Sequence, residues 1–469
     1  MSNQAALPGS DREAPETAVE SVSMTQQVIR IAWPVVLENL LQTMLGLVNL
    51  WMIARIGVDA IAGAGNAQQY LMVGLAGLGA VGMGSSVLIS HSIGAGDMRT
   101  AERVARQSVM LGLGFAAILS VAGIIFAYPA NLILGVTPEV AAIGAGYLQI
   151  IAGTSVGMVG MILMGAVIRG TGDSRTPMKI TLVANVLSAL LSYWLIFGGL
   201  GVAPMGVNGA AWGMGLARTV GAGILLWVLM SGRARIRLAG RMGWLPNLAI
   251  IKRMLGIGLP SAAEQLLISG GFLVLTGIIA QLGTNVLAAH RIVFQFLSLS
   301  GMLNMGFGVA ATTLVGIQMG ARRPDLAEEA NWISVKMGLA ITSVALFVFM
   351  FFGEPLMLLF APGEPEVVHF GAQTLKVIAF AQPFFAISNI VSGSLRGAGD
   401  TRMPMYLAAL GMWLIRLPGA YVFGLLFQWS LMGVYGATVL DAAVRSVLYV
   451  RRFRARGWHK LDVLRGIRR

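Results

Sequence analysis

The chain has 469 residues, of which 56% are hydrophobic and 11% are charged, and its formal net charge is +13. A soluble domain carries about 25% charged residues, so this composition excludes a protein that faces water on all sides. The absence of cysteine from the sequence excludes disulfides and thiolate metal ligands.

The first 24 residues are polar and acidic and lack the basic-then-apolar pattern of a secretory signal, so we expect 1–24 to be a disordered cytoplasmic tail. Apolar stretches of about 20 residues then recur, each long enough to cross a bilayer as a helix. There are twelve of them, at residues 34–54, 66–90, 107–127, 140–168, 178–199, 208–230, 256–280, 286–316, 333–352, 369–394, 405–425 and 432–450. The predicted fold class is therefore an all-α polytopic membrane protein with twelve transmembrane helices.

The basic residues are distributed unevenly between the loops. If the N-terminus is inside, most Lys and Arg fall in inner segments, at 97–106, 169–179, 232–253, 320–330, 396–402 and 451–469. The outer loops near 128–138, 200–207, 353–366 and 426–431 contain none, and Arg55 is the one clear exception. This asymmetry predicts cytoplasmic N- and C-termini and a location in the plasma membrane, the inner membrane of a bacterium. The basic residues form no single groove interleaved with aromatic residues, so we expect no nucleic-acid partner.

The second half of the chain repeats the first. The decapeptide RGTGDSRTPM (169–178) recurs as RGAGDTRMPM (396–405), with seven identical positions. Other anchors recur in the same order at an offset of 226 or 227 residues, including PVVLENLL at Pro34 with PSAAEQLL at Pro260, and MGVNGA at Met205 with MGVYGA at Met432. The chain is thus a tandem duplication of six helices, and an even number gives both halves the same orientation in the membrane.

Four boundaries follow from the duplication. We expect an N-lobe at 25–231, a basic cytoplasmic connector at 232–253, a C-lobe at 254–450 and a basic cytoplasmic tail at 451–469. The connector mixes basic and apolar residues, which predicts that part of it is an amphipathic helix on the inner face.

The decapeptides have the composition of a structural loop at the inner end of each lobe's fourth helix. The arginines suit a helix C-terminus, the glycines allow a tight reversal, the aspartates accept backbone hydrogens, and the prolines suit the first turn of the next helix. The residues assigned to this role are Arg169, Gly170, Gly172, Asp173 and Pro177, with Arg396, Gly397, Gly399, Asp400 and Pro404. An intramembrane aspartyl protease would share the Gly-x-Gly-Asp pattern, but its Tyr-Asp dipeptide is absent from this sequence.

Ionisable groups inside the predicted helices are functional candidates, because each costs roughly 2.5–3.5 kcal/mol at a helix centre. They are Glu38, Glu264, His290, Arg291, Arg416, Arg218 and the pair Asp441–Arg445. Glu38 and Glu264 are repeat equivalents, four residues after prolines that we expect to open their helices, and both are candidates for ion coupling or for a structural ion pair. His290 is a candidate proton relay or a packing histidine.

Arg416 lies in the middle of its predicted helix and needs a carboxylate or another polar partner nearby. We expect a network of Arg416 with Glu264 or with His290, and we expect Pro418 to break the helix and leave unpaired carbonyls. Asp441 and Arg445 are four residues apart, which predicts a simple ion pair along one helix.

The two six-helix halves, the two PxxxExLL openings, VGIQMGA (315–321), AAHRI (288–292) and the doubled RGxGDxRxPM resemble the multidrug and toxic compound extrusion (MATE) family. The resemblance covers about residues 25–455. It implies a V-shaped pair of bundles around a central cleft, and export of mostly cationic, amphipathic compounds in exchange for sodium or protons.

The coupling residues of the family do not all have counterparts in this chain. Where one branch has LVD in the first helix, this sequence has LVN with Asn49, and where that branch has Asn and Asp in the fifth helix, it has Ser188 and Ser192. In the other branch Glu264 has a counterpart, whereas the segment 379–389 contains no acid. The residues that we expect to line the cavities are Asn49, Ser188, Ser192, Gln382, Asn389, Arg291 and Arg416.

The sequence contains no phosphate-binding GxxxxGK[ST] loop, no HExxH and no cofactor motif, so we expect neither an enzyme, nor a cofactor, nor a bound metal. The predicted function is a secondary antiporter, a monomer in the lipid bilayer that exports small organic compounds in exchange for H⁺ or Na⁺. A flippase for a lipid-linked saccharide, or an exporter of another metabolite in the same superfamily, is the alternative.

Overall fold

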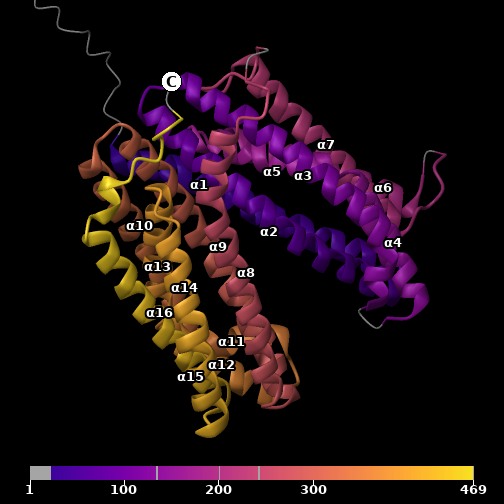
Figure 1. Ribbon diagram of the computed structural model, residues 1–469. Helices are drawn as coiled ribbons and strands as arrows, with labels where there is room; N and C mark the ends of the chain where they lie inside the picture. Colours follow the sequence, from indigo (N-terminus) through magenta and orange to yellow (C-terminus); the bar gives the residue numbers. More distant parts are fainter. Residues whose placement is uncertain (1–22, 134–135, 200, 241–242, 468–469) are drawn as a thin grey trace, which may run out of the picture.

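The computed structural model describes residues 23–133, 136–199, 201–240 and 243–467 (Figure 1). The predicted disordered tail at 1–24 lies outside these residues except for Ser23 and Met24. The helices of the first half are α1 (Met24–Ala54), α2 (Val58–Gly94), α3 (Met98–Ile133), α4 (Pro138–Gly153), α5 (Ser155–Gly170), α6 (Arg175–Phe197) and α7 (Val207–Ser231).

The second half adds a short extra helix and a distorted one. Its elements are α8 (Leu248–Ala280), α9 (Thr284–Gly320), α10 (Pro324–Phe351), α11 (Gly353–Phe360), α12 (Pro365–Ala379), α13 (Gln382–Gly397), α14 (Arg402–Ala409), the π-helical η1 (Leu410–Arg416), α15 (Leu417–Gly419), the π-helical η2 (Ala420–Leu426), α16 (Ser430–Arg454) and the 3₁₀ turn η3 (Gly457–Lys460).

The predicted twelve spans are confirmed. Within the described part of the chain, nine helices are long and apolar enough to cross a membrane, and two bent helix pairs act as one span each. The remaining span is α2, a helix of 37 residues. The run from α14 to η2 is a single span, Arg402–Leu426.

The fourth span of each lobe is bent in the same way. α4 and α5 meet at an angle of 53°, and so do α12 and α13. The bends fall at Thr154 and near Ala381, which are repeat equivalents. In the C-lobe, Pro383 lies in the first turn of α13 and cannot donate to a continuous helical ladder. The duplication therefore preserves a distortion as well as a sequence.

The two lobes contact each other through a pair of matched crossings. A methyl group at Gly94 would clash with the Ile317 carbonyl, and one at Gly320 would clash with the His91 carbonyl. Each residue of one contact lies 226 positions from its counterpart in the other. A contact in which each side presents the same pair of residues is the mark of a two-fold axis, so α2 and α9 cross on the axis that relates the lobes.

A second matched pair flanks this crossing. Gly258 on α8 packs against the Ala80 carbonyl on α2, and Gly306 on α9 packs against the Ala32 carbonyl on α1. These residues are again related by 226 positions. We call the region formed by residues 28–36, 80–94, 254–258 and 306–320 the closed end of the molecule.

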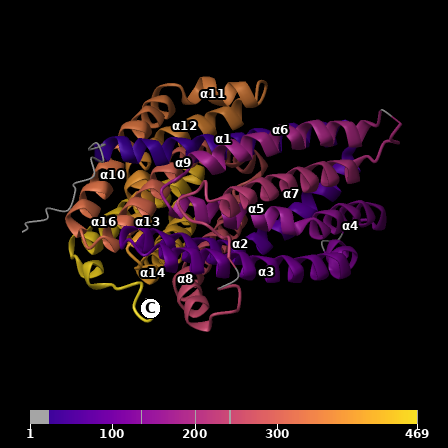
Figure 2. The ribbon, with the colours of Figure 1, turned by 90° about the horizontal axis from the view of Figure 1, so that it is seen from above.

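From the closed end the lobes diverge, so the molecule has the V shape that the family resemblance implies (Figure 1). The C-terminus lies at the closed end, whereas α11 and α12 lie at the far end of the C-lobe (Figure 1). Seen from above, α1, α2, α8 and α9 lie between the outer helices of the two lobes (Figure 2). These four helices therefore carry the contact between the lobes.

Two helix starts differ from the prediction. α1 begins at Met24 and α8 at Leu248, so Pro34 and Pro260 lie inside the helices rather than opening them. The true starts have side-chain caps: Ser23 accepts a hydrogen bond from the Gln26 amide, and Asn247 accepts from the amides of residues 249 and 250. Glu38 and Glu264 consequently lie near the middle of their helices, deeper than the sequence analysis placed them.

The connector contains no amphipathic helix in its described residues before Leu248, contrary to the prediction. Ala234, Ile236 and Leu238 are buried in the hydrophobic cluster of the N-lobe. Arg106 donates to the carbonyls of residues 237, 238 and 239, and Gln107 donates to those of residues 243 and 245. Because α3 satisfies these backbone groups, the segment has no need of helical hydrogen bonds.

The last described residues also pack onto the protein instead of forming a free tail. Trp458 is fully buried and stacks on Phe453 at 4.7 Å between ring centroids. Val463 and Leu464 join the hydrophobic cluster that contains Leu88 of α2. Arg253 of α8 donates to the carbonyls of residues 462 and 463 at 2.6 and 2.8 Å. This C-terminal segment, 457–467, therefore covers the closed end.

Candidate functional site

The carboxylate of α1 is held by the first decapeptide. Arg169 Nη1 donates to Glu38 Oε1 and Oε2 at 3.2 and 3.1 Å, and Thr181 Oγ1 donates to Oε1 at 3.2 Å. Glu38 therefore has three hydrogen bonds from two helices, α5 and α6. This is the structural ion pair that the sequence analysis named as one of two roles for Glu38.

The equivalent carboxylate of α8 is held more loosely. Arg396 Nη1 lies 3.9 Å from Glu264 Oε2, and this oxygen is buried without a hydrogen-bond partner among the described residues. Arg396 instead donates to the carbonyl and the hydroxyl of Ser392 at 3.3 and 2.8 Å. Glu264 is thus the less constrained member of an equivalent pair.

The decapeptides have the predicted loop geometry. Gly172 and Gly399 have positive φ angles of 88° and 93°, which favour glycine. Asp173 Oδ1 accepts from the amides of residues 175 and 176, and Asp400 Oδ1 accepts from the amide of residue 403. Pro177 and Pro404 lie in the first turns of α6 and α14, as predicted.

The decapeptides also pack against the closed end, which the sequence did not reveal. Gly170 packs against the Ser86 backbone of α2, and Gly397 packs against the Thr312 carbonyl of α9. His91 Nε2 lies 2.8 Å from the Gly397 carbonyl oxygen. Because a carbonyl only accepts, His91 donates this hydrogen bond, and it links α2 of the N-lobe to α13 of the C-lobe.

The C-lobe encloses a cavity of about 310 Å³ between α8, α9, α13, η1 and α16. Its polar lining includes His290, Asn304, Gln382, Asn389 and Arg416. Its apolar lining includes Phe272, Phe294 and Phe385. We call it the C-lobe cavity. Four predicted site residues, His290, Gln382, Asn389 and Arg416, therefore lie on one cavity.

Arg416 pairs with Asp441, and not with Glu264 or His290 as expected. Arg416 donates from Nε to Asp441 Oδ2 at 2.8 Å, and its Nη2 lies 2.6 Å from the same oxygen. Arg445 donates to Oδ2 at 2.8 Å, and its Nε lies 2.7 Å from Oδ1. The predicted Asp441–Arg445 pair is confirmed, but Asp441 also pairs with a second arginine, Arg416, from the neighbouring helix.

We call Arg416, Asp441 and Arg445 the triad, and two features of the sequence accompany it. A methyl group at Gly411 would clash with Asp441 and Arg445, so the charges fit against η1 only because position 411 has no side chain. In addition, the N-lobe equivalents of Arg416 and Asp441 are Ala189 and Met214. In a duplicated chain, charged residues that occur in one copy alone indicate a role specific to that copy.

The helix around Pro418 is continuous rather than broken. The chain is π-helical on both sides of the proline, in η1 and η2. The wider π-helical hydrogen-bond register accommodates Pro418, which has no N–H to donate. Such π segments are frequent at functional sites. Arg416 ends η1, so the register places its side chain toward Asp441.

His290 has an aromatic partner that the sequence analysis missed. Its Nδ1 lies 3.0 Å from the Tyr435 hydroxyl, and the two rings are 5.9 Å apart. The ring of Phe294 is 6.0 Å from that of His290 on the other side. His290 is therefore fixed in the wall of the C-lobe cavity between α9 and α16.

The other predicted cavity residues lie elsewhere. Arg291 is exposed, because it follows His290 on a helical turn and points away from the bundle. Ser192 is buried where α6 packs against Gly213 of α7. Asn49 and Ser188 are buried in the N-lobe, each with a side-chain oxygen that has no partner among the described residues.

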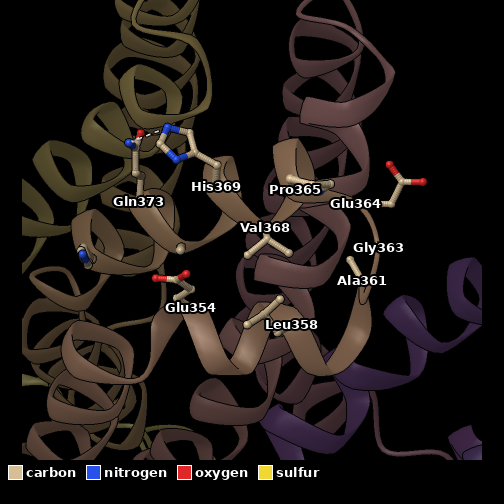
Figure 3. Close-up of a pocket in the computed structure, with 11 residues that line it drawn as sticks. Glu354, Leu358, Ala361, Gly363, Glu364, Pro365, Val368, His369 and Gln373 are labelled. Atoms are coloured by element: carbon tan, nitrogen blue, oxygen red, sulfur yellow. Dashed lines mark hydrogen bonds between the residues drawn. The ribbon is translucent and has the colours of Figure 1, made fainter.

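A larger surface hollow of about 420 Å³ lies between α11 and α12 at the far end of the C-lobe (Figure 3). His369 and Gln373, one turn apart on α12, hydrogen-bond to each other at 2.9 Å, whereas Glu364 points away from the hollow (Figure 3). Within the described residues, no three His, Asp or Glu side chains lie close enough together to hold a metal ion. The polar residues of the C-lobe cavity are thus the better candidates for a binding site.

Comparison with known proteins agrees with this architecture. The MatE family model matches the chain twice, at residues 34–194 and 260–422, once in each lobe. A probable multidrug resistance protein NorM from Thermotoga maritima is 33% identical over 449 residues, which is 95% of each chain. The corresponding protein from Bradyrhizobium diazoefficiens is 30% identical, over 91% of this chain and 92% of its own length.

The fold is also shared with solved structures. One of these, an outward-facing multidrug resistance MATE transporter of the MOP superfamily, has a TM-score of 0.85 at 21% identity, over 92% of this chain and 96% of its own. Both lobes, the V shape and the sequence relatives therefore lead to one assignment. The chain belongs to the MATE family, and it is an integral membrane efflux transporter of small organic compounds and not an enzyme.

Proposed function

We propose that the chain exports amphipathic organic compounds in exchange for protons, by alternating access of its two lobes. The observation that carries this proposal is the closed end. The lobes meet there through equivalent glycine contacts that a two-fold axis relates, while their other ends diverge (Figure 1). Two rigid bundles that meet through small residues can separate at this end and approach each other at the other end, by rocking about an axis parallel to the membrane, without repacking their cores.

The closed end is also the basic end of the molecule, and we assign it to the cytoplasm. Arg169, Arg253, Arg322, Arg396 and Arg452 lie at or next to the helix ends there. By the positive-inside rule, the conformation described is then open to the outside.

The surroundings of the carboxylates favour protons over sodium. The three carboxylates near the middle of the spans, Glu38, Glu264 and Asp441, each have an arginine partner. A sodium ion needs several oxygen ligands and would compete with the arginine already beside the carboxylate, whereas a proton needs only one lone pair of a carboxylate oxygen. The gradient supplies about 2.3 kcal/mol for each charge that crosses 100 mV.

Glu264 is the residue that we assign to coupling. It loses least on protonation, because its only charged partner within the described residues is 3.9 Å away. That partner, Arg396, is adjacent to Gly397, whose carbonyl accepts the hydrogen bond from His91 in the other lobe. A change in the position of Arg396 on protonation of Glu264 is therefore transmitted directly to the contact between the lobes.

Purified protein in lipid vesicles provides the test. We expect a pH gradient to drive transport of a fluorescent organic substrate, and a sodium gradient at equal pH on both sides to have no effect. Glu264→Gln should abolish the response to the pH gradient, whereas Glu38→Gln, its equivalent in the N-lobe, should retain it when adjusted for the amount of folded protein. Transport driven by sodium alone would contradict the proposal.

A further inference from the structure

The charged groups that line the C-lobe cavity are both arginines. Arg416 and Arg445 line it, whereas Asp441 is fully buried behind them and has both carboxylate oxygens in contact with their guanidinium groups. These two cations and one anion leave an excess of one positive charge at the cavity wall. An organic cation is repelled from such a wall, and an anion is attracted to it.

A buried donor without a partner lies on the same cavity. Gln382 is 1% exposed, and its Oε1 accepts a hydrogen bond from Ser300 at 2.6 Å. This hydrogen bond fixes the amide, and its Nε2 has no partner among the described residues. Buried donors are nearly always paired, so the cavity presents an N–H group that a ligand with an acceptor would satisfy.

The remaining wall is aromatic. Arg416 lies 5.7 Å from the ring centre of Phe272 and 6.0 Å from that of Phe385. Phe294, whose ring lies 6.0 Å from that of His290, completes this wall. A volume of about 310 Å³ suits a small organic molecule. The cavity thus combines cationic and neutral donors with a flat apolar surface.

We propose that the C-lobe cavity binds an organic monoanion, an aryl or alkyl carboxylate, as a substrate of this transporter. The carboxylate accepts from Arg416, Arg445 and the Gln382 amide, and the apolar body packs among Phe272 and Phe385. The role as a transported substrate rests on the proposed function, but binding does not. This substrate class differs from the cationic one that the family resemblance implies.

The N-lobe provides a built-in comparison. It retains Arg218, the equivalent of Arg445, but has Ala189, Met214 and Ser155 at the positions of Arg416, Asp441 and Gln382. The triad and the amide donor are therefore specific to the C-lobe, as expected if they recognise a ligand and not if they stabilise the common scaffold.

Equilibrium dialysis with purified protein in detergent tests the binding, with three probes of the same shape: 2-naphthoate, the neutral 2-naphthamide and 2-naphthylmethylammonium. We expect naphthoate to bind at least tenfold more tightly than the amide, and the ammonium compound to bind weakest. Arg416→Gln and Arg445→Gln should each weaken naphthoate binding at least tenfold. Arg218→Gln, the matched change in the N-lobe, should leave it unchanged.

Two further variants separate recognition from folding. Gln382→Leu leaves the charges intact and should weaken naphthoate binding about fivefold. Asp441→Asn keeps an acceptor for both arginines, raises the positive excess, and should bind naphthoate at least as tightly as wild type. Equal binding of naphthoate and the amide, or unchanged binding in folded Arg416→Gln, would overturn the proposal. Binding without gradient-driven uptake in vesicles would support the site and contradict the transport function instead.

Discussion

The two lobes of this transporter descend from one sequence, yet their charged groups are arranged differently. Glu38 in the N-lobe has three hydrogen bonds at 3.1 to 3.2 Å, whereas its equivalent Glu264 has one arginine at 3.9 Å. Arg416 and Asp441 have no charged counterparts in the N-lobe. What both copies keep is the scaffold: the bent fourth span, the decapeptide loops and the glycine contacts. The Arg416–Asp441 pair, to which we assign ligand binding, occurs in the C-lobe alone, whereas the glutamate to which we assign ion coupling occurs in both copies and differs in how tightly its arginine holds it.

The largest effect is expected at Asp441, because its removal leaves two buried guanidinium groups without a counter-charge. Asp441→Leu should lower the free energy of unfolding by about 3–5 kcal/mol. The matched change in the N-lobe, Met214→Leu, conserves volume and should cost less than about 1.5 kcal/mol. Thermal unfolding of the two variants in detergent compares them, and equal melting temperatures would show that the triad does not stabilise the C-lobe.

The closed end gives a second comparison within one helix. Gly258→Val places a side chain against the Ala80 carbonyl, whereas Gly256→Val, two residues earlier and on another face of α8, meets nothing within 4 Å. Both variants lose the same helix propensity, but only the first should weaken the contact between the lobes, by about 1–3 kcal/mol, which corresponds to a roughly 5- to 150-fold change in population.

Spin labels at cysteines introduced at the exposed positions Met98 and Arg322 report this change, since the chain has no cysteine of its own. We expect the distance distribution to shift toward separated lobes in Gly258→Val alone. The same shift in both variants would mean that the helix, and not the contact, is affected.

The same substitution at the two equivalent glutamates should affect mainly stability at Glu38 and mainly transport at Glu264. Glu38→Gln loses hydrogen bonds to a charged group, so unfolding should become easier by about 1.5–3 kcal/mol. Glu264→Gln should change stability by less than about 1 kcal/mol, because its ion pair is long, but should lose the response of transport to pH. Unfolding in detergent and vesicle transport measure the two effects, and a larger loss of stability in Glu264→Gln would contradict the comparison.

The smallest effect is expected where equivalent acids hold the segments that follow the sixth span of each lobe. Glu102 accepts from the Arg237 amide, and Glu328 pairs with Arg456 and His459. Arg456 is exposed, so Arg456→Gln should lower the melting temperature only slightly, and salt should remove the difference. Glu102→Gln, which affects a contact to the backbone, should have the larger effect, and the difference should persist in salt.

The scaffold could be predicted because the length of the hydrophobic segments, the charge asymmetry of the loops and the internal repeat are all patterns in the linear order of residues. The decapeptide turns could be predicted for the same reason, because glycine, aspartate and proline determine the backbone conformation within a few residues of themselves. The partner of Arg416 could not be read in this way, because Asp441 lies 25 residues further on and the choice between it, Glu264 and His290 depends on how α16 packs against η1. The start of α1 was misplaced because Pro34 is a stronger signal in sequence than the cap at Ser23.

The C-terminal segment has a consequence for how the protein is made. Val463 and Leu464 complete a hydrophobic cluster whose other members come largely from α2, α3 and α5. These helices leave the ribosome more than two hundred residues before the segment does. The first-synthesised lobe therefore waits in the membrane with part of its interior uncovered until Val463 and Leu464 have been synthesised and have packed against it.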